Sequence, residues 1–125
     1  MTIALSLAIL MSIVTFLVHT FIGGIYVARP LLADKNLPVA SKWLNYYCWH
    51  VTSIMIVFLG IGFWLCQQDQ ENSVMIGFLA ALSTASAILS AAVALKGRIN
   101  PLRFPSTSLF SGIALCGWAA LWQAM

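Results

Sequence analysis

The sequence has very little charge. Of its 125 residues, 7% are charged and 62% are hydrophobic, whereas a soluble domain carries about 25% charged residues. A chain this apolar cannot cover its surface with polar groups, so lipid must surround most of it. In lipid every backbone polar group must be bonded internally, which allows only helices or closed barrels. Barrel strands alternate apolar and polar residues, so the long unbroken apolar runs seen here favour helices.

Residues that carry chemistry are also scarce. No Asp, Glu, Lys or Arg falls inside an apolar run, so the buried carboxylate of proton-coupled exporters is missing. The sequence shows no nucleophile with an oriented base and no glycine-rich phosphate loop. Its three cysteines form no CxxC pair, which argues against a disulfide framework and against thiol–disulfide chemistry. We therefore expect that this chain is not an enzyme on its own.

Four apolar runs are long enough to be membrane-spanning helices, which take about 20 residues each. They cover about 2–28, 43–66, 73–95 and 106–125. The first run lacks the basic start of a signal peptide, so we expect it to remain as the first helix. Short connections make consecutive helices antiparallel neighbours. The sequence predicts an all-α integral membrane four-helix bundle, up-down-up-down, with residues 1–125 as one domain.

The basic residues predict the orientation of the bundle. All six lie in or beside the first and third connections: Arg29, Lys35, Lys42, Lys96, Arg98 and Arg103. The second connection has only the acidic residues Asp69 and Glu71. The positive-inside rule then places both termini outside the cytoplasm, N-out/C-out. We interpret the net charge of +3 as this topology signal, so the expected partner is the lipid bilayer and not nucleic acid.

Two histidines form the candidate site. His19 lies ten residues before Arg29, and His50 lies eight residues after Lys42. At 1.5 Å per residue they stand about 15 Å and 12 Å from the same end of the bundle. In antiparallel neighbours they can face each other, and ionisable groups inside a membrane are functional candidates by default.

Other residues extend this candidate site along the same helix faces. Steps of +3 and +4 place side chains on one face of a helix. In the first run these are Ser12, Thr15, His19, Gly23 and Tyr26, and in the second run they are Trp43, Tyr46, Tyr47, His50 and Ser53. From these we take His19, His50, Tyr46, Tyr47, Gly23 and Thr15 as candidate cofactor-binding residues. A helix-packing role explains the small and hydroxyl residues equally well.

Several uses of the histidine pair remain open. Both could ligate the iron of a b-type haem, since bundle cores hold cofactors between facing helices. A bare metal site is weaker, because zinc or copper usually takes three or four ligands. A quinone or similar apolar molecule could hydrogen-bond a histidine or tyrosine. Alternatively, each histidine simply bonds a hydroxyl or carbonyl of a neighbouring helix, such as Thr15 or Tyr46 for His19.

Three stretches carry a family resemblance: LVHTFIGGIYVARPLL, YYCWHVTS and FPSTSLFSGIALCGW. The chain resembles a family of small bacterial four-helix inner-membrane proteins without an assigned activity. The shared pattern is His-x-Phe-x-Gly-Gly (residues 19–24), Arg-Pro-Leu-Leu (29–32) and Trp-His-x-Thr (49–52). The resemblance implies a multi-pass protein of the bacterial inner membrane, and it implies no chemistry.

Two classes of function follow for the whole chain. The first is a non-catalytic accessory or structural component that packs against a larger membrane complex or against further copies of itself. The second is a redox or ligand-binding protein that uses His19 and His50. The first asks nothing special of the sequence, and we take it as the leading expectation.

Overall fold

The computed structural model describes residues 1–69 and 72–125, and the elements in these residues are all helices. They are α1 (Thr2–Leu17), the π-helical segments η1 (Val18–Ile22) and η2 (Gly24–Ala28), α2 (Arg29–Ala33), α3 (Val39–Gln68), α4 (Ser73–Lys96), the 3₁₀ turn η3 (Pro101–Arg103) and α5 (Pro105–Ala124). The prediction of an all-α chain is confirmed for these residues. Glu71, part of the predicted acidic connection, lies outside them.

The first helix is longer than its sequence predicts. α1, η1, η2 and α2 form one helical rod from Thr2 to Ala33, whereas the Arg-Pro dipeptide predicted an end near Ala28. Pro30 has no N–H to donate inside a helix. The wider turn of η2, in which the Arg29 N–H donates to the Gly24 carbonyl, directly precedes Pro30. The rod ends at Asp34, which has an extended backbone and whose Oδ1 accepts from the N–H of Asn36 at 2.7 Å.

Three helical stretches of the described chain are long and apolar enough to cross a membrane: Thr2–Ala33, Val39–Gln68 and Ser73–Lys96. This supports a membrane protein. α5, the fourth predicted span, falls outside this group because its first half carries four hydroxyl side chains, Ser106, Thr107, Ser108 and Ser111. Its 20 residues nevertheless form a continuous helix of about 30 Å.

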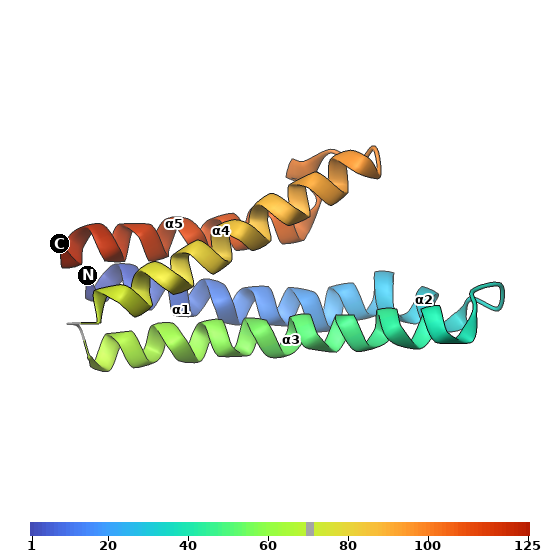
Figure 1. Ribbon diagram of the computed structural model, residues 1–125, viewed down its shortest axis with the longest axis horizontal. Helices are drawn as coiled ribbons and strands as arrows, with labels where there is room; N and C mark the ends of the chain where they lie inside the picture. Colours follow the sequence, from blue (N-terminus) through green and yellow to red (C-terminus); the bar gives the residue numbers. More distant parts are fainter. Residues whose placement is uncertain (70–71) are drawn as a thin grey trace.

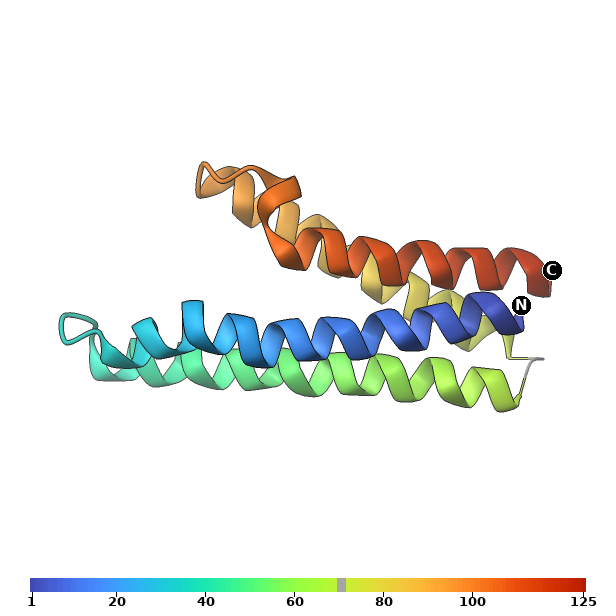
Figure 2. The same cartoon turned by 180° about the vertical axis from the view of Figure 1, so that it is seen from behind.

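The helices are arranged as two pairs (Figure 1). α1 packs along α3, α4 packs along α5, and α1 also contacts α5. Seen from behind in Figure 2, the pairs lie close together at the end that holds both termini and diverge toward the other end. α1 makes most of the contact between the two pairs, and α3 also contacts α4.

The core lies where the two pairs meet. Each long helix contributes at least one fully buried large side chain, for example Leu5 of α1, Phe63 of α3, Ile76 of α4 and Ile113 of α5. Gly117 allows α5 to approach closely, because a Cβ there would lie 2.9 Å from the Cβ of Ala80. Close packing at this end fixes how the helices are rotated about their axes, and the divergence leaves space at the opposite end.

Candidate functional site

A π-helical stretch carries the first histidine. His19 lies in η1, and Gly23 separates η1 from η2. π-helical turns are rare, and they occur frequently at functional sites because the extra residue in the turn redirects side chains. Here they occupy the part of the first helix that faces the space between the diverging pairs.

His19 rests on Trp49 of α3. The two ring centroids lie 3.9 Å apart and the ring planes differ by 18°. The His19 Nε2 is also 3.2 Å from the Trp49 carbonyl oxygen. A carbonyl can only accept, so Nε2–H donates, and in the neutral ring Nδ1 keeps its lone pair. The partner of His19 is thus a backbone carbonyl of the neighbouring helix. Thr15, one of the partners considered from the sequence, instead donates its hydroxyl to the Met11 carbonyl at 2.7 Å.

The indole of Trp49 fits there because residue 23 is a glycine. A Cβ at Gly23 would lie 2.5 Å from the Trp49 Cη2, a distance that no side chain tolerates without movement. A Cβ at the adjacent Gly24 would meet no atom within 4 Å. The two glycines of the Gly-Gly pair therefore have different roles, and only Gly23 is needed for contact between the helices.

The space between the diverging pairs is a cavity of about 390 Å³, which we name the His19 cavity. Its wall includes residues of the first helix (Thr15, His19, Gly23 and Tyr26), of α3 (Trp49 and Thr52) and of the start of α5 (Phe104, Pro105, Ser106 and Phe110). The lining is largely apolar with a few polar groups, and its size lies within the range of roughly 300–1,000 Å³ typical of ligand pockets. Four of the residues predicted to share one face of the first helix thus line one cavity.

His50 lines a different cavity, of about 400 Å³, which we name the His50 cavity. It lies between η1, η2, α2 and the first half of α3, and Trp49 lines both cavities. The rings of Tyr46 and His50 meet edge to face in it, with centroids 4.5 Å apart. Arg29 and Thr20 also line it.

The structure thus divides the predicted site residues between two cavities. His19, Gly23 and Thr15 line the first, His50 and Tyr46 line the second, and Tyr47 lines neither and is 64% exposed. A haem held by both histidines needs both rings to face one cavity, and here they line different cavities, while the Trp49 carbonyl engages the His19 Nε2. This arrangement does not fit a shared iron. Among the described residues, no three His, Cys, Asp or Glu side chains gather into a metal-binding group.

Both histidines lie closer to the basic ends of their helical stretches than to the opposite ends. About 20 residues span the hydrocarbon core, and α5, with 20 residues, begins at Pro105. Twenty residues from Thr2 reach Phe21, and twenty residues back from Gln68 reach Trp49. Since these helix ends lie at the same end of the molecule (Figure 1), His19 and His50 are level with the start of α5.

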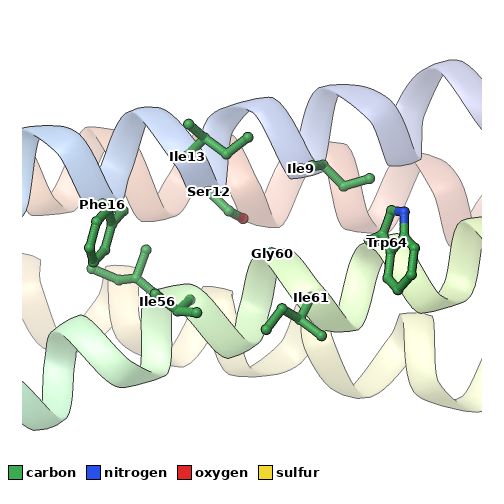
Figure 3. Close-up of a pocket in the computed structure, with 9 residues that line it drawn as sticks. Ile9, Ser12, Ile13, Phe16, Ile56, Gly60, Ile61 and Trp64 are labelled. Atoms are coloured by element: carbon green, nitrogen blue, oxygen red, sulfur yellow. The ribbon is translucent and has the colours of Figure 1, made fainter.

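A third hollow lies between α1 and α3, closer to the termini (Figure 3). It measures about 300 Å³ and is lined by Ile9, Phe16, Ile61 and Trp64 among other apolar side chains. Its polar member, Ser12, donates to the Ala8 carbonyl at 2.8 Å. With that hydroxyl engaged, the hollow offers apolar contact and no chemistry.

Sequence reasoning did not select Trp49, Thr20 or Arg29 as site residues. Arg29 and Trp49 do occur in two of the three short patterns that carry the family resemblance. These patterns were the one feature of the sequence that could have indicated them. No family model, curated protein or solved structure matches this chain. The resemblance to small bacterial inner-membrane proteins therefore stays a prediction.

Proposed function

We propose that this chain is a small, non-catalytic membrane protein that binds a hydroxyl-bearing apolar molecule, such as a quinol, in the His19 cavity. The observation that carries this proposal is the fixed imidazole at the cavity wall. Its Nε2 is held by the Trp49 carbonyl, so the lone pair of Nδ1 can accept from a ligand O–H. A quinone carbonyl could not pair with Nδ1, because the carbonyl oxygen and the unprotonated nitrogen are both hydrogen-bond acceptors.

The remaining lining supports a ligand that is apolar with one polar end. The other polar side chains in the wall of this cavity are Thr15, whose hydroxyl donates to the Met11 carbonyl, and Tyr26, Thr52 and Ser106. The Thr52 hydroxyl donates to the Cys48 carbonyl at 3.1 Å, and the Ser106 hydroxyl pairs with that of Ser90 at 2.7 Å. Since the threonine and serine hydroxyls already have partners and Tyr26 is 76% exposed, His19 is the group best placed to fix the orientation of a ligand.

The proposed setting is the bacterial inner membrane, with the basic end in the cytoplasm and α5 as the fourth span. All six basic residues belong to α2, the start of α3, the end of α4, η3 or the connections beside them. These segments lie opposite the two termini in Figure 1. An arrangement with N-out and C-out follows from the positive-inside rule, and the family resemblance supports the bacterial setting.

The ligand proposal is tested with a short-chain quinol and its quinone under anaerobic conditions. Binding to the protein in mild detergent is measured by equilibrium dialysis for the wild type, His19→Ala and His50→Ala. We expect quinol to bind more tightly than quinone, and His19→Ala to weaken quinol binding about tenfold, as loss of about one good hydrogen bond implies. His50→Ala is the matched control and keeps wild-type affinity. Equal quinol binding by the wild type and His19→Ala would overturn the proposal.

The second candidate function is an accessory subunit of a membrane complex. Ala81, Ala85 and Ala92 lie exposed along α4, which packs mainly on α5. Small residues allow the close helix–helix approach on which association in lipid depends. A bulky substitution such as Ala85→Leu should then abolish co-purification of a partner or second copy, and Ala40→Leu, outside that face, should not. Unchanged co-purification with Ala85→Leu would exclude this face.

A further inference from the structure

The His50 cavity contains groups that the proposed ligand site does not use. A hydrogen-bond donor without a partner lies in its wall, since the Thr20 hydroxyl oxygen is buried and makes no hydrogen bond. Threonines in helices usually donate to the carbonyl four residues earlier, as Thr15 and Thr84 do here. Thr20 lies in η1, where π-helical bonding changes the position of those carbonyls. Its hydroxyl is therefore available to a ligand.

Cationic groups lie at the other end of the same cavity. Arg29 lines it and is exposed, and the Lys42 ammonium donates to the carbonyl of Leu32, a lining residue, at 3.2 Å. The nearest acidic side chain in this connection, Asp34, is engaged with the backbone N–H groups of Asn36 and Leu37. The mouth of the cavity thus carries net positive charge.

Helix direction makes the polar groups converge. Side chains lean toward the N-terminus of their helix, so Arg29 leans back toward Thr20 and the membrane. Tyr46 and His50 belong to α3, which begins at the basic end, so they lean toward that end. Arg29 is nine residues from Thr20, so their backbones are separated along the helix by at most about 13 Å, because this largely π-helical stretch rises less per residue than an α-helix. The long Arg29 side chain leans back over part of this distance, which suits a ligand with an anionic group at the surface and a polar linkage below it.

Part of the cavity wall is apolar and lies exposed on the outer surface of the helices, where lipid lies in the proposed setting. Phe21 and Ile25 line it and are 64% and 51% exposed. A Cβ at Gly24, another lining residue, would meet no atom within 4 Å. The cavity therefore has room beside an exposed apolar wall. A free soluble anion would leave that wall unused, whereas a lipid would cover it.

We propose that the His50 cavity binds an acidic phospholipid of the leaflet on the basic side. Arg29 contacts the phosphate, Tyr46 and His50 offer further donors, and Thr20 donates to an ester carbonyl of the lipid. An acyl chain lies over Phe21 and Ile25. This site is separate from the proposed quinol site, and the two share Trp49 alone in their walls.

The test uses native mass spectrometry of the full chain with equimolar phosphatidylglycerol and phosphatidylcholine. We expect phosphatidylglycerol to be retained preferentially. Arg29→Gln should lower that preference about fivefold, which corresponds to roughly 1 kcal/mol for one basic residue near a membrane surface. Arg103→Gln, a basic residue in η3 that does not line the cavity, is the matched control and keeps the preference. Equal retention of the two lipids would overturn the proposal, as would equal losses in the two variants.

Two further arms address folding and the source of the phosphate. Thr20→Val removes the free hydroxyl at nearly constant volume, so it should weaken lipid retention while the lipid-free protein melts at the same or a higher temperature. A lower melting temperature with unchanged lipid retention would contradict a ligand role for Thr20. Inorganic phosphate should not displace the lipid, and full displacement would indicate a site for a free anion instead. His19→Ala should leave lipid retention unchanged, which keeps this proposal distinct from the quinol site.

Discussion

The indole of Trp49 lies parallel to the imidazole of His19, with ring centroids 3.9 Å apart, and its carbonyl oxygen accepts from the same histidine. One residue of α3 thus contacts His19 through both its side chain and its backbone. Trp49 also lines the two cavities in which His19 and His50 lie. It therefore links the first helix to α3 beside the two cavities, and it lies between the two histidines.

The contact between Trp49 and Gly23 predicts a difference between neighbouring glycines. Gly23→Ala places a methyl group 2.5 Å from the Trp49 ring, and overpacking of this kind costs about 1–3 kcal/mol. Gly24→Ala meets open space and should be neutral, or more stable by a few tenths of a kcal/mol because alanine favours a helix. Thermal unfolding in one detergent compares the two variants, and equal melting temperatures would contradict the described packing.

The division of the histidines between two cavities predicts the visible spectrum. Protein purified after expression with added haem should show no Soret band and no sharp α and β bands in a reduced-minus-oxidised spectrum. His19 and His50 line different cavities with Trp49 in the wall of both, so the two rings do not face one iron as arranged. A Soret band that disappears in both His19→Ala and His50→Ala would show that α1 and α3 rearrange around a haem.

The end of α4 predicts a stabilising substitution. Arg98 has a φ of 56°, in the left-handed region that costs a non-glycine residue about 1–2 kcal/mol. The N–H of Ile99 donates to the Ala94 carbonyl at 2.8 Å, which is the bonding of a helix end that favours glycine at this position. Arg98→Gly should raise stability by about 1 kcal/mol in detergent unfolding. Arg98→Ala removes the same charge and should give no such gain; a similar gain from both would attribute the effect to charge.

The distribution of basic residues predicts reporter activity. A reporter that works only in the periplasm should be active when fused after Met125, and a cytoplasmic reporter should be active when inserted in the connection 34–38. The positive-inside rule gives this direction. Activity of the cytoplasmic reporter after Met125 would reverse the orientation. Neutralising Lys96, Arg98 and Arg103 together should produce a mixed orientation of α4 and α5, because these three residues are the basic residues that flank that pair.

The helices themselves were well predicted from sequence, with instructive errors at their ends. The starts of the first and third helices and the end of the fourth agree within a residue with the bounds observed. The first helix continues past Pro30, because the π-helical turn of η2 leads into the proline. α3 begins at Val39, four residues before the predicted start, because polar and basic residues there reduce the hydropathy of a segment that is still helical. Hydropathy measures solubility in lipid, whereas a helix can extend beyond the membrane.

The candidate site was predicted in part. Thr15, His19, Gly23 and Tyr26 were expected on one face, and they line one cavity. Trp49 was not predicted as the partner of His19, because nothing in the sequence distinguished it from the other apolar residues of the second run. The rotation of α3 decides this point. The buried face of α3 contains Ile56, Leu59 and Phe63. Toward the start of the helix, steps of four and three residues place Thr52 and Trp49 on this same face, whereas His50 lies off it.

The sequence by itself determined the all-helical chain, the long apolar stretches and the clustering of basic residues, because hydropathy and charge are properties of adjacent residues. Only the tertiary structure decided which of the neighbours Trp49 and His50 faces His19. Consecutive residues of a helix point about 100° apart, and the choice between them depends on how the core rotates α3. It also decided that the start of α5 lines the same cavity as His19. Packing between residues far apart in the sequence fixes both of these features, and no local sequence pattern contains that information.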